Sequence, residues 1–126
     1  MVQQEVRQYD LKARSTETFG RVLCSARTHH FVVDGPLQND CPGEAITPAE
    51  LFLSGVAACG VELLQVLARA QHMPLQAATV AIRAVLDPSK PVRAGVSLFN
   101  MVRLHFHLKG VTKEQGAQLI EAFKRR

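Results

Sequence analysis

The stretch that decides the fold is TPAELFLSGVAACGVELLQVLARA, residues 47–70. Its first four residues have the pattern of a helix start. Thr47 suits the N-cap, Pro48 the first helical position, and Glu50 the third, where it can complete a capping box with Thr47. The apolar residues that follow cover most of the helix circumference, so we expect a helix buried on nearly every side. In a small domain, such a helix needs cover from a sheet and from a partner subunit.

A narrow polar stripe interrupts this helix, formed by Glu62, Gln65 and Arg69. Because Glu62 breaks the apolar run, no stretch of about 18 uncharged apolar residues exists, and we expect no transmembrane span and no membrane partner. The first five residues are polar and do not have the basic-then-apolar pattern of a signal peptide. We therefore expect the protein in the cytoplasm.

The rest of the chain reads as strands and turns, with one further helix. The expected strands are residues 2–14, 21–27, 31–33, 77–86 and 96–108. A turn at Asp34-Gly35-Pro36 and a loop over 37–46 precede the long helix. A second capping box begins at Thr112, and Leu119, Ile120 and Phe123 share one face of the helix that follows. Hairpins on both sides of a long helix predict an α+β fold with antiparallel sheets.

Length and composition indicate one globular domain over residues 1–126. The apolar fraction is 47% and the charged fraction 21%, so a disordered chain is not expected. The net charge of +4 is scattered along the sequence, and Lys124 to Arg126 is the one basic run. Nucleic-acid binding needs basic residues gathered on one face, so we expect no nucleic-acid partner. The chain stops inside the last predicted helix, and we expect that a native C-terminal segment is missing.

Cys59 is the first candidate for chemistry. It lies among small residues in Gly55-Val56-Ala57-Ala58-Cys59-Gly60, which leave room for a substrate or for a second element. The competing interpretation is a small apolar residue in the core, a common place for a free cysteine. A reactive thiol needs a nearby cation to lower its pKa. Arg14, Arg21 and Arg27 of the first hairpin are candidates, and the sequence alone selects none of them.

Glu50 is the second candidate. A carboxylate near a thiol can orient an arginine or take a proton from a peroxide. The capping box with Thr47 explains Glu50 equally well. Helical geometry favours the cap, because at 100° per residue Glu50 and Cys59 point to opposite sides of the helix.

Two further groups of residues carry ligand-type side chains. Cys24, His29, His30 and Cys41 could suit zinc, but their spacing matches no standard pair of ligand doublets, so we expect no metal and no other cofactor. His105 and His107 share a strand face with Arg103. This face is interpreted as a solvated or dimer-facing polar strip, and the alternative is the wall of a ligand pocket.

Three motifs together resemble one protein family. They are FVVDGP at 31–36, TPAELFL at 47–53 and AAC at 57–59. In this order and spacing they look like the OsmC/Ohr family of osmotically inducible and organic hydroperoxide resistance proteins, and the OsmC-like branch in particular. The likeness covers most of the chain from Gly20 onward. It implies antiparallel sheets wrapped around a long central helix, in an intertwined homodimer with its active sites at the subunit interface.

The resemblance also implies a chemistry. The best-studied members of the family reduce organic hydroperoxides in oxidative-stress defence, and the helix cysteine, here Cys59, becomes a sulfenic acid. An arginine of the first hairpin and a glutamate at the helix start assist, which assigns these roles to Arg21 and Glu50. A second cysteine, in a Cys-Pro segment after the last helix, closes a disulfide. A dithiol reductant, a lipoylated protein in some members, restores the thiols.

The sequence departs from this pattern in two places. The glutamate of the family peroxidases directly follows the proline, a position held here by Ala49, and Glu50 comes one residue later. No Cys-Pro segment follows Arg126, although Cys41-Pro42 occurs elsewhere. Cys24, Cys41 or an external thiol must then resolve the sulfenic acid. These departures favour a rival function, a dimer without peroxidase activity that binds a small apolar ligand at its interface. A third hypothesis is a structural dimer with Cys59 in its core.

Overall fold

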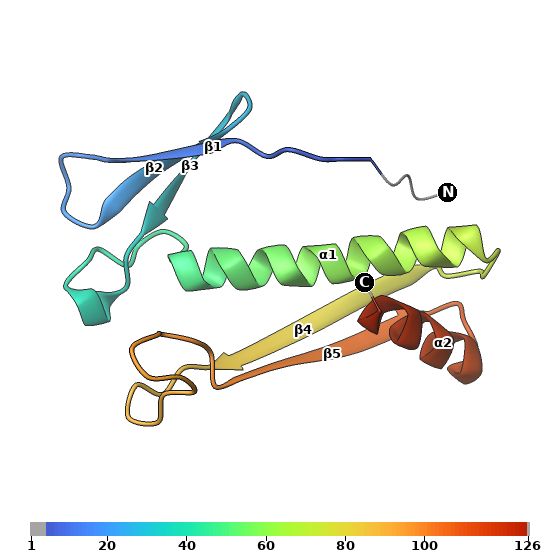
Figure 1. The fold of residues 1–126 in the computed structure, drawn as a ribbon. Coiled ribbons are helices and arrows are strands. Elements are labelled where there is room, and N and C mark those ends of the chain that lie inside the picture. Colours follow the sequence, from blue (N-terminus) through green and yellow to red (C-terminus); the bar gives the residue numbers. More distant parts are fainter. Residues whose placement is uncertain (1–4, 126) are drawn as a thin grey trace. The chain divides into compact units, whose positions relative to one another are not determined.

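The structure, a computed structural model, describes residues 5–125 (Figure 1). Its elements are β1 (Leu11–Ser15), β2 (Arg21–Ala26), β3 (His29–Asp34), the 3-10 helix η1 (Leu37–Asn39), α1 (Pro48–Ala70), β4 (Ala77–Val85), β5 (Met101–Lys109) and α2 (Lys113–Lys124). The strands form two antiparallel sheets, one in the order β1-β2-β3 and one pairing β4 with β5. The predicted α+β class, with a long helix between two groups of strands along the chain, is confirmed.

The described residues divide into two compact units, 5–52 and 53–125. The first contains the three-stranded sheet, η1 and the start of α1. The second contains the rest of α1, the β4–β5 ribbon and α2. The boundary falls inside α1, between Phe52 and Leu53.

In the unit 5–52, the first strand is shorter than predicted. Residues 5–10 form no strand, and pairing begins where Leu11 meets Ala26, the last residue of β2. The chain then turns at Arg27, whose φ of 54° is left-handed, so β2 offers no partner beyond this point. The expected strand over 2–14 is therefore wrong for residues 5–10, and its residues 2–4 lie outside the described range. By contrast, β3 is longer than the expected 31–33, because it pairs along the whole of β2.

In the unit 53–125, the ribbon of β4 and β5 pairs over nine residues on each strand. Side chains alternate between the two faces, so Phe106 and Leu108 point toward the helices while their neighbours are exposed. The second strand begins at Met101 and not at 96 as expected. The reason is Asn100, whose side chain accepts from the Asp87 backbone N–H at 2.7 Å and donates to the Lys90 carbonyl at 2.6 Å. These bonds close residues 86–100 into a loop.

The core of this unit lies between α1, α2 and the inner face of the ribbon. Leu64 and Leu67 of α1 pack with Leu119 of α2, and Phe106 borders them. Gly60 lets the ribbon approach the helix closely, because a Cβ at that position would lie 3.3 Å from the Phe106 ring. The predicted capping box of α2 is confirmed: the Gln115 backbone N–H donates to Thr112 Oγ1 at 3.1 Å, and the Gln115 side chain accepts in return.

Within a single chain the long helix is not buried on nearly every side, and the rest of the expected cover was assigned to a partner subunit. Its buried residues form one face, at Gly60, Leu64, Leu67 and Ala68. This follows from the architecture of the unit 53–125, where a two-stranded ribbon and one short helix cover a single side of α1. By length and composition alone, α1 could cross a membrane even with Glu62 in it, but the core helix of a soluble protein meets the same criterion.

The core makes the first testable prediction. Leu119 is fully buried, so Leu119→Ala should remove apolar contacts and leave a cavity. We expect a loss of about 2–5 kcal/mol in the free energy of unfolding, measured by urea denaturation. The matched control is Leu98→Ala in the exposed loop, where 44% of the residue is accessible and the expected change is within about 0.5 kcal/mol. Equal effects of the two substitutions would contradict this assignment of the core.

Candidate functional site

Cys59 lies on the exposed side of α1. The thiol is free and exposed, and among the described residues its side chain makes no hydrogen bond or ion pair. Cys59 is therefore not buried by its own chain as expected, because the next residue, Gly60, is the one that faces the core. Small neighbours at Gly55 and Ala58 are exposed as well. The thiol is thus open to solvent or to whatever binds this side of α1.

Arg21 begins β2 and is held by two carboxylates. Its Nε donates to Asp34 Oδ1 at 2.8 Å and its Nη2 to Asp34 Oδ2 at 2.9 Å, which makes a two-point ion pair across the sheet. Nη2 also donates to Glu44 Oε1 at 2.9 Å. The pairing register places Arg21 opposite Asp34, so the sheet itself brings the two together. This geometry fixes the position of the guanidinium more firmly than a single contact would.

Asp34 is the buried end of this network, with none of its surface exposed. Besides the two bonds from Arg21, its Oδ2 accepts from the backbone N–H groups of Glu44 at 3.0 Å and Ala45 at 2.9 Å. These partners hold the pKa of Asp34 far below its usual range, with the Arg21 side chain as the largest cause. The hydrogen bond from Asp34, followed by that from Glu44, raises the pKa of Arg21 above its usual value. Both groups therefore stay charged.

One edge of the Arg21 guanidinium stays available. Its Nη1 makes no hydrogen bond within residues 5–125, whereas Nε and Nη2 are occupied. Of the other two candidates, Arg14 lies on the same sheet face, opposite Leu23 and diagonal to Arg21. Arg27 occupies the left-handed turn between β2 and β3. Neither makes an ion pair with a described residue, so Arg21 is the one arginine of the three whose orientation is fixed by its own unit.

Glu50 forms the predicted capping box. Its Oε1 accepts from the Thr47 backbone N–H at 3.0 Å and from Thr47 Oγ1 at 2.9 Å, while its own N–H donates to Thr47 Oγ1 at 3.3 Å. These bonds lower the pKa of Glu50, the backbone bond being the largest cause. Glu50 is therefore an exposed carboxylate that already serves the start of α1.

The two remaining cysteines lie in the unit 5–52 and are half-buried. Cys24 is opposite Phe31 in the β2–β3 pairing. Cys41 sits in the loop after η1, with its Sγ 3.5 Å from the Asn39 carbonyl, and its side chain fills the space beside Gly20 and Gly35. A Cβ on either glycine would collide with this side chain, which explains why glycine precedes Arg21 and follows Asp34.

The two histidines near Cys24 occupy different faces of the sheet. His29 pairs with Ala26 and His30 with Ser25, so alternation separates them. The His30 Nδ1 lies 2.8 Å from Ser25 Oγ. Within residues 5–125, no three His, Cys, Asp or Glu side chains gather as metal ligands. His105 and His107 lie with Arg103 on the exposed face of β5.

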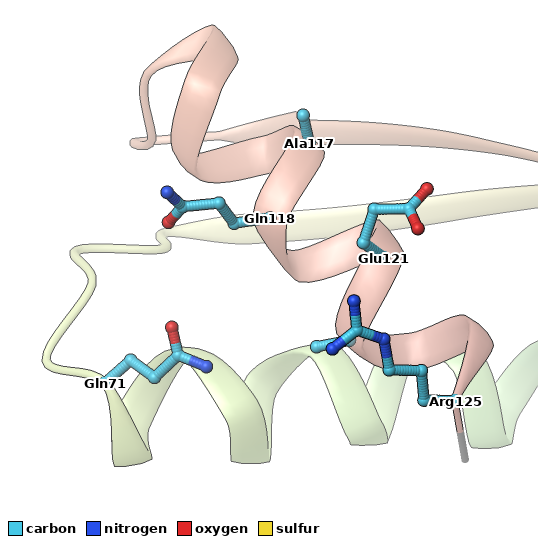
Figure 2. Close-up of a pocket in the computed structure, with 6 residues that line it drawn as sticks. Gln71, Ala117, Gln118, Glu121 and Arg125 are labelled. Carbon is cyan, nitrogen blue, oxygen red and sulfur yellow. The ribbon is translucent and has the colours of Figure 1, made fainter.

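A pocket of about 420 Å³ lies between the end of α1 and α2 (Figure 2). In Figure 2, Gln71 lies across from Gln118 of α2, and Glu121 and Arg125 border the same space. A second pocket, of about 780 Å³, borders the polar stripe of α1. Cys59 lines neither of them, so we do not place the candidate chemistry in either pocket.

Sequence reasoning missed Asp34 as a site residue. The sequence assigns Asp34-Gly35-Pro36 to a turn and to a family motif without a role for the carboxylate, and β3 does end at Asp34. Two signals could have revealed more. An acidic residue at the end of an apolar strand run needs a buried partner, and Arg21 begins the neighbouring strand of the same hairpin.

The comparison with protein families decides the identity. The family model described as OsmC-like protein matches residues 41–126, which include the capping box, α1 and Cys59. The chain belongs to the OsmC-like family. The resemblance drawn from the sequence motifs is thus confirmed. No curated protein matches the chain.

Solved structures of OsmC-like and organic hydroperoxide resistance proteins share this fold. An OsmC-like protein from Mycoplasma pneumoniae has a TM-score of 0.80 at 17% identity, covering 95% of this chain and 82% of that one. A Legionella pneumophila organic hydroperoxide resistance protein, OsmC, has a TM-score of 0.73 at 21% identity, covering 97% of this chain and 85% of that one. A putative organic hydroperoxide resistance protein from Vibrio cholerae, with captopril bound in one of its active sites, has a TM-score of 0.73 at 22% identity. It covers 98% of this chain and 83% of its own. At these identities the likeness establishes the fold of this OsmC-like protein.

The buried carboxylate makes the second prediction. Asp34→Asn should lower the unfolding temperature at pH 6–8 by roughly 5 °C or more, because the Arg21 ion pair is lost. The folded pKa of Asp34 is depressed, so its stabilisation is present above the unfolded value near 4 and is lost as pH falls toward the folded value. The difference in unfolding temperature between wild type and variant should therefore become smaller below about pH 4.

The control for this experiment is Asp40→Asn, an exposed residue in the left-handed region, which asparagine also tolerates. It should change the unfolding temperature little at any pH. A gap for Asp34→Asn that stays constant from pH 7 to pH 3 would show that the lost contacts are not those of a charged carboxylate.

Proposed function

We propose that this protein is a thiol-dependent peroxidase that reduces organic hydroperoxides through Cys59 in oxidative-stress defence. The observation that carries the proposal is an exposed, free thiol at the motif position of an OsmC-like helix. Two proteins of the same fold are named organic hydroperoxide resistance proteins, and one of them binds captopril in an active site. These names support the substrate class.

The first step is a two-electron oxidation of sulfur. The Cys59 thiolate attacks one oxygen of the peroxide bond, an S–O bond forms and the O–O bond breaks. The alkoxide that leaves takes a proton and departs as an alcohol, so the hydroperoxide is reduced and Cys59 becomes a sulfenic acid. Exposure of the thiol meets the access requirement for this step.

The assisting groups are Arg21 and Glu50. A guanidinium beside the sulfur stabilises the thiolate, and Arg21 suits this role because Asp34 fixes its orientation and leaves Nη1 without a hydrogen bond to a described residue. A carboxylate can orient this guanidinium or accept the peroxide proton. The depressed pKa of Glu50 keeps it ionised, although it must share its oxygens with the Thr47 cap. The proposal therefore requires that both groups lie beside Cys59 in the assembled protein, each supplied by the same chain or by a partner subunit.

The second step removes the sulfenic acid. A thiolate attacks the Cys59 sulfur, a disulfide forms and the oxygen leaves as water after protonation. Cys24, Cys41 or an external thiol supplies the attacking sulfur. A dithiol reductant, including one of the lipoyl type, then exchanges with the disulfide and returns Cys59 to the thiol.

We also propose that the protein acts as a homodimer in the cytoplasm. Only one face of α1 is buried by its own unit, and large apolar residues such as Phe52 remain exposed. A soluble monomer seldom leaves such a surface uncovered. A second copy packed on this side of α1 would bury it and would place Cys59 at the interface.

A second candidate function is a dimer without peroxidase activity that binds a small apolar ligand at its interface. Two observations favour it: Ala49 follows Pro48 where family peroxidases have glutamate, and both Arg21 and Glu50 already have structural partners. This alternative predicts that Cys59→Ser keeps ligand binding and any biological effect. The peroxidase predicts that the same substitution abolishes both turnover and protection.

The third prediction concerns Cys59 itself. Incubation of the reduced protein with an organic hydroperoxide should produce one sulfenic acid, located on Cys59 by mass spectrometry of a trapped adduct. Cys24 and Cys41 should remain thiols in the first turnover, because both are half-buried in the unit 5–52. Cys59→Ser should lower turnover with a dithiol reductant by at least about 100-fold.

The matched variant for this test is Cys24→Ser/Cys41→Ser, which keeps Cys59 as the one cysteine. It should still form the sulfenic acid at the wild-type rate, even if its later reduction is slow. Failure of Cys59 to oxidise selectively in both proteins would overturn the peroxidase and leave the ligand-binding dimer.

The fourth prediction separates the arginines. Arg21→Lys keeps the charge but cannot make the two-point contact with Asp34, so the remaining cation should be misplaced. We expect the rate of Cys59 oxidation to fall by about 10-fold or more. Arg14→Lys and Arg27→Lys should leave this rate unchanged. If Arg14→Lys slows the oxidation and Arg21→Lys does not, the assisting cation is Arg14.

A further inference from the structure

Cationic side chains gather on the outer face of the β4–β5 ribbon. The register places Arg83 directly opposite Arg103, and alternation along β5 puts three more basic or imidazole side chains on the same face. We call this set the basic face; its members are Arg83, Arg103, His105, His107 and Lys109. All five are exposed, and none of their side chains makes an ion pair or hydrogen bond with a described residue.

The acidic residues of the chain leave this face uncompensated. Neither β4 nor β5 contains aspartate or glutamate. The nearest acid along the chain is Asp87, two residues beyond β4, and Ser89 engages its carboxylate through N–H at 3.0 Å and Oγ at 2.6 Å. The basic face therefore carries three permanent positive charges and two imidazoles without an opposing charge in the ribbon.

This arrangement is not explained by stability. Like charges directly opposite on neighbouring strands destabilise a sheet, so the pair of Arg83 and Arg103 costs folding free energy. The core does not use these side chains either, because the opposite face of the ribbon packs on the helices. A binding role would account for a pair of like charges that stability does not favour.

The kind of partner follows from what the face lacks. Protein interfaces are centred on aromatic anchors and are poor in charge, and single-stranded nucleic acids stack their bases on aromatic side chains. The outward residues between the cations are small or aliphatic, at Ala77, Thr79, Ala81, Val85 and Met101, with no aromatic ring among them. A charged surface without an aromatic anchor among these residues fits the phosphate backbone of a duplex, which binding proteins recognise by charge without reading sequence.

We propose that the basic face binds the phosphate backbone of double-stranded nucleic acid. Residues two apart on a strand are about 6.7 Å apart, so Arg103 to Lys109 extends over about 20 Å. One duplex strand rises about 3.4 Å along the axis per phosphate and winds around it, so the face can meet only the phosphates on the near side of about 20 Å of duplex. Binding is independent of base sequence, weak and strongly dependent on salt. It does not require the chemistry of Cys59.

The test is fluorescence anisotropy with a labelled duplex DNA of about 20 base pairs at about pH 8. With three permanent cations engaged, log K against log salt should have a slope of about −2.7 between about 50 and 200 mM. Absence of binding at about 50 mM salt, with protein up to about 1 mM, would refute the proposal.

The decisive variant is Arg83→Glu. It should weaken duplex binding by at least about 10-fold at low salt and reduce the slope by about 1. It also places a glutamate opposite Arg103, an attractive pair, so the unfolding temperature should stay level or rise. Weaker binding in an equally stable protein separates a lost contact from a damaged fold.

The matched control is Lys124→Glu/Arg125→Glu, which reverses described charges of the basic run at the end of α2. This variant should still bind the duplex. If it alone lost binding, the binding site would be the basic run and the proposal would be wrong. Poly-glutamate is the competing polyanion. If it binds more tightly than the duplex at equal charge, the partner is an acidic protein and the nucleic-acid assignment is wrong.

Discussion

The order of the unit 5–52 depends on one buried carboxylate. Asp34 ends β3 with no exposed surface, and it accepts from the start of β2 and from two backbone N–H groups of the loop after η1. Its own N–H donates to the Ile46 carbonyl at 3.0 Å, directly before the Thr47 cap. A charge can be buried only when it is paired and hydrogen-bonded, and here the pairing ties hairpin, loop and helix start together. The same bonds orient Arg21, so the constraint that shapes the loop also prepares the proposed catalytic cation.

Local signals in the sequence were sufficient for most of the fold. Both capping boxes, and with the first of them the start of α1, follow from side chains that interact within three residues of each other. Strand lengths were predicted less well, because a strand extends only as far as its partner does. Leu11 finds the end of β2 opposite it, and Asn100 takes residues 86–100 into a loop by contacts with Asp87 and Lys90. Neither constraint can be read from a propensity pattern.

The sequence nominated the residues of the candidate site and did not indicate their surroundings. Cys59 and Glu50 follow from a motif, but apolar character alone indicated that α1 would be covered on nearly every side. An apolar composition indicates that a surface is buried, and it does not indicate whether the same chain or a partner subunit buries it. The ribbon and α2 supply one layer only, against Leu64 and Leu67. The exposed position of Cys59 is thus a consequence of how little one chain of this length can enclose, which is why a partner subunit enters the proposed function.

Charge shows the same difference between composition and arrangement. The basic residues are scattered along the sequence, and from that scatter no nucleic-acid partner was expected. Strand pairing changes the argument, because residues 83 and 103 are distant in sequence and become direct neighbours. Neither strand of the ribbon contains an acidic residue. Because side chains alternate, one face of the ribbon is apolar and packs on the helices, and the other face carries the cations and does not. The inner face accounts for folding. The outer face lowers the stability of the fold, because two arginines lie directly opposite each other. A loss of folding free energy in a small protein is the physical reason to look for a ligand on this face.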